Sequence, residues 1–206
     1  MSPFPPGLGN VAGPAKGWQA ANSIAYDRSS RLLAEIRREF PDFGIRRKRE
    51  SAWQRAIGLV LRILTFGGQR HYVSRYHTVL FGKLYVSDAW DEMTDDARYV
   101  LLRHERVHLD QRRRMGDLAM AIVYILIFFP IVFAWGRARI EWEAYVETIR
   151  ATAEVFGLEA ARGLEPEIVR RYVGPDYGWM WPFPGAVKSW FREVIADLEA
   201  ERVSSD

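Results

Sequence analysis

The segment HERVH at 104–108 combines two imidazoles and a carboxylate at a spacing that suits metal chemistry. Residues four apart lie on one face of an α-helix, so His104 and His108 can bind the same ion. Glu105 stands between them and can accept a proton from a water molecule that the ion activates. The segment therefore predicts a Zn²⁺ site with the two histidines as ligands and Glu105 as the general base.

The composition restricts what else can hold the ion. The chain has 206 residues, four histidines and no cysteine, which excludes thiolate ligands, cysteine nucleophiles and iron–sulfur clusters. A catalytic zinc site needs a third protein ligand and one position left open for water and substrate. No histidine follows His108, so the third ligand is expected to be a carboxylate. Glu141 and Glu143 are the two candidates.

The phase of a helix predicted over 137–156 separates these two glutamates. At 100° per residue, Glu143 falls on a charged stripe, whereas Glu141 falls on the opposite face together with Ala144 and Tyr145. A ligand has to lie on the buried face, and the small Ala144 leaves room for the helix that carries the histidines. We therefore favour Glu141 as the third ligand, with Glu143 as the alternative.

These residues resemble the gluzincin branch of zinc metallopeptidases, in which a Glu in an ExxA-type helix completes an HExxH site. The segment EWEA at 141–144 matches that second motif. The layout over about residues 78–148 is similar to that of the CAAX-prenyl-protease group and of the antibiotic-sensor peptidases of bacterial membranes. The resemblance implies an α+β, mostly helical zincin-like fold with a small sheet beside the active-site helix. It also implies that the two histidines and Glu141 bind zinc and that Glu105 is the catalytic base.

One position departs from the pattern of those families. They commonly place Asp four residues after the ligand Glu, where it orients a histidine, whereas this chain has Tyr145. A tyrosine hydroxyl can still form a hydrogen bond at that place. The departure leaves open a second interpretation, in which the zinc site is structural and the chain is a noncatalytic, membrane-associated scaffold or interaction protein.

Sequence patterns also predict the elements that position these residues. A Pro/Gly-rich, flexible lead-in is expected over 1–17, followed by a single zincin-like domain over 18–206. Apolar residues at three- and four-residue spacings predict helices, and segments rich in Val, Tyr, Phe and Thr predict strands. The expected elements are a helix over 18–40 ended by Pro41, an extended piece at 43–50, a helix over 51–64, strands within 71–87, a long helix capped by Asp88, Asp91, Thr94 or Asp95 and ended by Arg112–Arg114, the helix over 137–156, and a last helix near 186–201. The sheet edge near Thr78 to Val86 is expected to pair with an extended peptide.

The segment 118–135 has no charged residue over about eighteen positions, which is the lower limit for a membrane span. A straight helix of that length would move the chain by about 27 Å and leave Glu141 across the membrane from His108. We therefore expect an apolar hairpin that turns at Phe129-Pro130, with arms of about 16 Å that cannot cross. The hairpin either enters one leaflet or is covered by the amphipathic helices as part of a core.

The charge and the N-terminus indicate the cellular setting. No basic segment precedes an apolar one at the start of the chain, so no secretory signal peptide is expected. We predict a cytoplasmic protein whose segment 118–135 would provide any contact with the inner face of a membrane. The formal net charge is only +3, and no nucleic-acid partner is expected, with a nucleic-acid-associated protein that uses its arginines as the alternative. The predicted reaction is hydrolysis of peptide bonds in a peptide or protein substrate.

Three further residues are secondary candidates. His71 and His77 lie in strand-like sequence and are interpreted as sheet histidines, with a place in the cleft as the alternative for His77. Tyr177 begins an aromatic segment, 177–182, that we interpret as a loop packed on the core. Its alternatives are a hydrogen bond from Tyr177 to the transition state and an anchor at a membrane surface.

Overall fold

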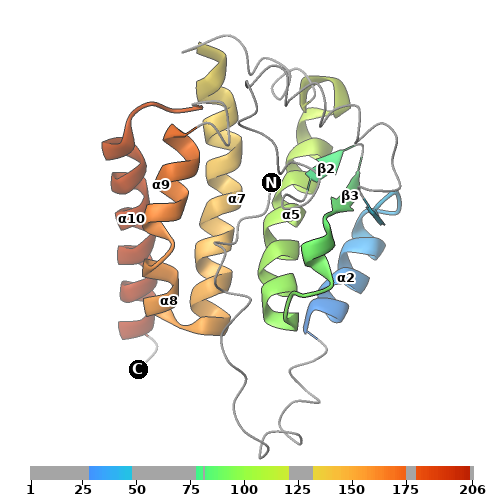
Figure 1. The fold of residues 1–206 in the computed structure, drawn as a ribbon, viewed down its shortest axis with the longest axis horizontal. Helices are drawn as coiled ribbons and strands as arrows, with labels where there is room; N and C mark the ends of the chain where they lie inside the picture. Colours follow the sequence, from blue (N-terminus) through green and yellow to red (C-terminus); the bar gives the residue numbers. More distant parts are fainter. Residues whose placement is uncertain (1–27, 48–77, 81, 121–131, 175–179, 205–206) are drawn as a thin grey trace, which may run out of the picture. The chain divides into compact units, whose positions relative to one another are not determined.

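The computed structural model describes residues 28–47, 78–80, 82–120, 132–174 and 180–204 (Figure 1). Several predictions lie outside these residues: the lead-in over 1–17, the helix over 51–64, His71, His77, the turn at Phe129-Pro130, and Tyr177. Contacts between Cα atoms divide the chain into two compact units, Met1–Leu109 and Asp110–Asp206. The boundary falls inside one continuous helix, α5 (Asp95–Met115). The single domain over 18–206 stays a prediction.

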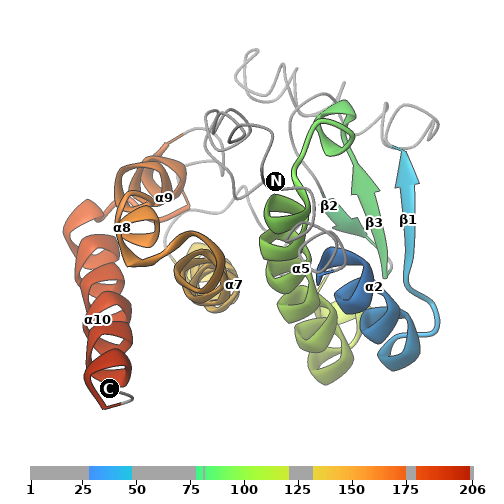
Figure 2. The same ribbon diagram turned by 90° about the horizontal axis from the view of Figure 1, so that it is seen from below.

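The first unit contains a small mixed sheet next to two helices. Its described elements are α2 (Arg28–Glu39), β1 (Gly44–Arg47), β2 (Thr78–Leu80), β3 (Lys83–Val86), the 3₁₀ helix η3 (Asp88–Trp90) and the first part of α5. The strand order is β1-β3-β2, with β1 parallel and β2 antiparallel to β3. Figure 2 shows α2 and α5 side by side next to this sheet. The predicted fold class, mostly helical with a small sheet beside the helix of the HExxH segment, is confirmed.

One apolar core holds α2, the sheet and α5 together. Its side chains recur at intervals of four along α2, of two along β3 and of seven along α5, as expected for one buried face of each element. Burying such a side chain stabilises the folded state by about 1.5–3 kcal/mol relative to leaving it exposed. The buried members are Leu32, Ile36, Phe43, Leu84, Val86, Leu102 and Leu109. The core therefore fixes which face of α5 points away from the sheet.

The predicted strands within 71–87 form β2 and β3, which pair as a β-hairpin, but β3 is not at the edge of the sheet. Gly82 has a φ of 72°, which side chains other than glycine rarely adopt, and it turns the chain from β2 into β3. Because β3 pairs with β1 as well as with β2, it has no free backbone edge for a peptide. The prediction of a sheet edge over Thr78 to Val86 is thus wrong for β3. Among the described strands, β2 is the edge strand from that hairpin.

Three acidic or hydroxyl residues that looked alike as caps of α5 have separate roles. Thr94 accepts a hydrogen bond from the backbone N–H of Ala97 at 3.2 Å and is the cap of α5. The Asp95 carboxylate instead accepts bonds from the backbone N–H and the hydroxyl of Ser29, in the first turn of α2. Asp91 accepts two bonds from the guanidinium of Arg47 in β1. Side-chain contacts far apart in sequence decide between these roles.

The end of α5 follows the prediction. The helix ends at Met115, and Gly116 has a φ of 84°, the left-handed conformation that ends many helices. Its last turn contains Arg112, Arg113 and Arg114, whose positive charges complement the negative end of the helix dipole.

The second unit is built of helices. After the end of α5 its described elements are α7 (Val132–Phe156), α8 (Leu158–Arg162), α9 (Glu165–Val173) and α10 (Pro184–Val203). In Figures 1 and 2, α9 lies beside both α7 and α10. Helix α7 begins at Val132, earlier than the predicted 137, and ends at Phe156 as predicted. Residues 132–135, the described end of the predicted apolar segment, therefore belong to the helix that carries Glu141.

An aromatic cluster packs these helices. The ring centroid of Trp142 in α7 lies 6.2 Å from that of Tyr172 in α9 and 5.5 Å from that of Trp190 in α10. Trp181 lies 6.0 Å from Trp190, and the preceding Met180 is buried. The described end of the aromatic segment 177–182 thus packs against the core, as the structural interpretation predicted.

The described parts of the apolar segment 118–135 are its ends. Leu118 and Trp135 are exposed to solvent. Within the described residues, no helix is both long and apolar enough to pass through a bilayer. Contact of the hairpin with one leaflet and its burial in a core both stay predictions.

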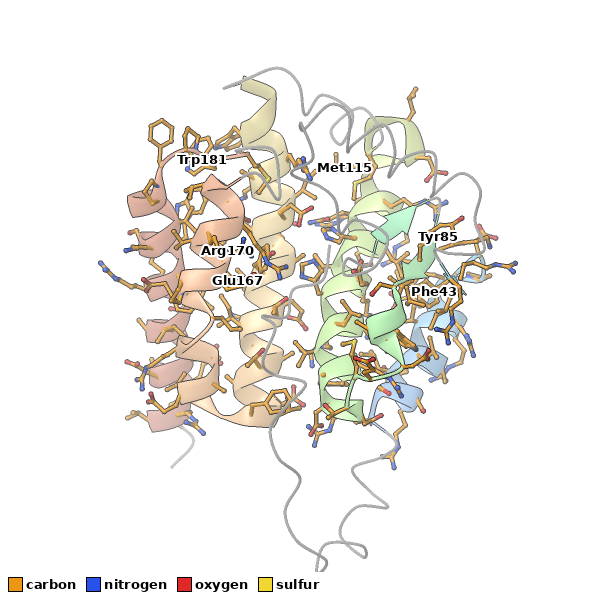
Figure 3. The ribbon with its side chains drawn as sticks, viewed as in Figure 1. Phe43, Tyr85, Met115, Glu167, Arg170 and Trp181 are labelled. Carbon is orange, nitrogen blue, oxygen red and sulfur yellow. The ribbon has the colours of Figure 1, made fainter. Side chains whose placement is uncertain are left out.

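An ion pair on α9 stabilises the second unit. The Glu167 carboxylate accepts hydrogen bonds from Arg171 at 2.8 Å and from Arg170 at 2.9 Å, and the Arg171 side chain is buried. Figure 3 shows the side chains of Glu167 and Arg170 on this helix. Desolvation alone would raise the pKa of Glu167, but the hydrogen bonds and charges of the two arginines outweigh it and lower that pKa below its ordinary value.

This lowered pKa predicts a pH-dependent contribution to stability. A carboxyl group that binds protons more weakly in the folded state stabilises it above the ordinary pKa of about 4.5 and loses that effect as the pH falls through the folded-state pKa. The variant Glu167→Gln should therefore be less stable than the wild type at pH 7, and the difference should shrink below about pH 4.5. Urea unfolding between pH 7 and pH 3 measures it. Glu165→Gln, in the first turn of the same helix, is the matched control, and an equal pH dependence in both variants would contradict the assignment.

Candidate metal centre

The two histidines of the HExxH segment converge on one point in the structure. His104 and His108 lie one turn apart on α5, and both side chains are buried. Their Nε2 atoms are 3.2 Å apart, and the ring planes meet at 81°. Two imidazole nitrogens bound tetrahedrally to one zinc ion at the usual bond length would be about 3.3 Å apart. The spacing in the structure fits that geometry.

Glu141 on α7 completes a group of three ligand side chains. The ligand atoms of His104, His108 and Glu141 all lie within 4.8 Å of one another. Glu141 is only 4% exposed, whereas the side chain of Glu143 is 42% exposed, so the predicted phase of α7 is confirmed. Ala144 and Tyr145, on the same face as Glu141, are fully buried. The structure thus groups Glu141, the favoured third ligand, with the two histidines and leaves Glu143 at the surface.

The chemistry of these three side chains suits a metal ion. Two imidazole nitrogens and one carboxylate oxygen form a donor set that proteins use for catalytic zinc, with a fourth position left for water or substrate. A divalent cation would be attracted by the carboxylate and by the nitrogen lone pairs of the two imidazoles. The three residues therefore fit the binding of a metal ion.

Glu105 lies on the same helix between the two histidines. Its side chain is buried, with 2% of its surface exposed, so the carboxylate is held within the protein. Its position next to His104 is fixed by α5, which packs on the core of the first unit through Leu102 and Leu109, within about 60° of Glu105 around the helix axis. The structure therefore holds a carboxylate beside the histidines on a rigid element, and its predicted role as a base stays a prediction.

Gln111, three positions after His108, is a buried residue near the site that the sequence did not single out. The Gln111 Nε2 atom donates hydrogen bonds to the backbone carbonyl of Ile140 at 2.9 Å and to the Glu143 carboxylate at 3.0 Å. The exposed Arg114 also pairs with Glu143 at 3.6 Å. Glu143 is thus a surface partner of α5. The signal for Gln111 in the sequence is its position at i+7 from His104 and i+3 from His108, on their side of the helix.

The Tyr145 hydroxyl has a partner that the sequence did not indicate. Arg171 of α9 donates to it through Nη1 at 3.4 Å, a long hydrogen bond, and Tyr145 also lies 5.8 Å from the ring of Tyr172. The Tyr172 hydroxyl in turn donates to the backbone carbonyl of Ala138. These contacts hold the buried face of α7 against α9. Tyr145 is therefore part of the packing behind Glu141.

The arrangement can hold a cation, keep a carboxylate beside it and exclude bulk water from its ligands, because all four side chains are buried. Such a site can activate water and polarise a carbonyl group. Its chemistry follows from the side chains of α5 and α7 alone. No protein-family model matches this chain, and no curated protein and no solved structure matches it.

Proposed function

We propose that this chain is a zinc-dependent peptidase. The observation that supports it is the group of His104, His108 and Glu141, whose ligand atoms lie within 4.8 Å of one another. The buried Glu105 follows His104 in the same helix, at the position of the base in an HExxH motif. The His/His/Glu donor set with an adjacent carboxylate is typical of hydrolytic zinc sites. The resemblance of the HERVH and EWEA segments to gluzincins supports the same roles for these four residues.

Each residue has a role in the proposed reaction. His104 and His108 would hold the ion through imidazole nitrogens, and Glu141 would hold it through a carboxylate oxygen. When bound, zinc supplies Lewis acidity toward water and toward the carbonyl of the scissile bond. Glu105 accepts the proton of the attacking water and passes it to the leaving amine. The burial of Glu105 raises the strength of its electrostatic interactions with the reacting groups.

The second candidate is a structural metal site in a noncatalytic protein. The observation that favours it is Tyr145, which stands where the similar families have Asp and whose hydroxyl accepts a hydrogen bond from Arg171. In this case the ion would tie α5 to α7 and stabilise the fold, since metal-binding free energy adds to folding free energy. This candidate predicts zinc binding without peptide hydrolysis.

One experiment separates the two candidates. Purified chain is analysed for zinc, and the zinc-loaded protein is incubated with a peptide library whose products are identified by mass spectrometry. The peptidase proposal predicts about one zinc per chain and cleavage that a zinc chelator abolishes and added zinc restores. Zinc without cleavage would favour the structural site, and the absence of zinc would contradict both.

A further inference from the structure

We propose that Gln111 is a positioning residue for the metal site, which fixes α7 against α5 so that Glu141 faces the two histidines. This inference rests on the metal site of the proposed function. Gln111 is 2% exposed, and its Nε2 atom bonds residues on either side of Glu141 in the sequence: the Ile140 carbonyl and the Glu143 carboxylate.

The position of Gln111 on α5 links it to the histidines. Seven residues after His104 and three after His108, it lies within about 60° of both around the helix axis. The side chain of Gln111 therefore leaves α5 on the same side as the two imidazoles. A contact between Gln111 and α7 fixes the part of α7 that carries Glu141, whose ligand atom lies within 4.8 Å of those of the two histidines.

The two acceptors restrain both movements that would displace Glu141. A helix can rotate about its axis, where one residue corresponds to 100°, or slide along it, where one residue corresponds to 1.5 Å. The Ile140 carbonyl belongs to the backbone of α7, so a bond to it restrains sliding directly. The bond to the Glu143 side chain, one turn further on, restrains rotation. Metal ligands tolerate only about 0.2 Å of error in bond length, so small shifts of Glu141 would weaken binding.

A second contact at this point, the ion pair between Arg114 and Glu143, is a weaker restraint. Arg114 reaches the Glu143 carboxylate at 3.6 Å, but both side chains are well exposed, and an exposed ion pair contributes little. The Gln111 amide is buried, and so is its hydrogen bond to the Ile140 carbonyl, so breaking that bond would leave buried polar atoms without a partner. Gln111 is therefore expected to restrain α7 more strongly than Arg114 does.

The test compares zinc affinity and coordination geometry in variants of the full chain. Gln111→Leu and Gln111→Met remove the donor and keep an apolar side chain of similar length in the core. We expect zinc affinity to fall about tenfold, the usual scale for residues that orient a ligand. The visible spectrum of the cobalt-loaded protein, recorded at saturating cobalt, should change because it reports ligand geometry. A purely structural role would lower the melting temperature of the metal-free protein and leave that spectrum unchanged.

A matched pair at Glu143 tests the same contact from the other helix. Glu143→Gln keeps an oxygen acceptor for Gln111, whereas Glu143→Leu removes it, and both remove the same charge. We expect Glu143→Gln to bind zinc like the wild type and Glu143→Leu to bind about threefold more weakly. In the Gln111→Leu background, the difference between the two should disappear. Because Glu143 is exposed, these variants are expected to fold even if the Gln111 variants do not.

The outcomes are distinct from those of the functional test. If the wild type binds zinc and the Gln111 variants bind it with equal affinity and an unchanged cobalt spectrum, the positioning role is overturned and the metal site stands. If the Gln111 variants do not fold, equal zinc affinity in Glu143→Gln and Glu143→Leu overturns the role. If the wild type binds no zinc, the role and the metal site are overturned together.

Discussion

His108→Ala should abolish stoichiometric zinc binding, and His104→Ala should do the same. Each change removes one of three protein ligands whose atoms lie within 4.8 Å of one another, and the remaining two cannot enclose the ion. Glu141→Ala should weaken zinc binding strongly for the same reason. Metal content after dialysis, measured by inductively coupled plasma mass spectrometry, gives the stoichiometry. Unchanged zinc in either histidine variant would exclude the site.

The control for the third ligand is the neighbouring acidic residue. Glu143→Ala removes a carboxylate from the same helix, but from its exposed side. We expect its zinc to remain stoichiometric at saturating metal, with the roughly threefold weaker affinity expected for Glu143→Leu, because both variants remove the acceptor of Gln111. Loss of zinc in Glu143→Ala, with zinc retained in Glu141→Ala, would show that the two glutamates have exchanged roles.

The parts of the fold that were predictable are those set by local pattern. Leu32 and Ile36 mark the buried face of α2 through their spacing alone, and Gly116 marks the end of α5. The phase of α7 follows from the 100° rotation per residue, which is why the spacing of residues alone places Glu141 on the buried face. Helix periodicity depends on residues that are close in the chain, so it can be recognised in the sequence alone.

The parts that were not predictable depend on contacts between distant residues. Asp95 looks like a cap of its own helix, but its carboxylate caps α2, because folding brings Ser29 next to it. Gln111 bonds residues about thirty positions away, and Arg171 reaches Tyr145 of another helix. No periodicity encodes such partners. The same limit applies to the order of the strands, which placed β3 in the middle of the sheet.

Glu105→Gln should retain zinc and lose peptidase activity. The replacement has nearly the same shape, so the buried side chain still fits between His104 and His108 and the three ligands are untouched. An amide cannot accept the proton of the attacking water or return it to the leaving amine. Loss of a general base lowers the rate by about 10²–10⁴-fold, and here we expect the decrease in kcat with little change in KM.

The measurement is steady-state kinetics on a peptide identified in the library assay, together with zinc content of the same preparations. Glu143→Gln is the matched control, because it makes the same carboxylate-to-amide change on an exposed residue that keeps its acceptor for Gln111. Its kcat should stay near that of the wild type. Equal turnover in wild type and Glu105→Gln would refute the assignment of Glu105 as the base. If Glu105→Gln loses both zinc and activity, Glu105 contributes to metal binding, and the loss of activity no longer reports on its role as a base.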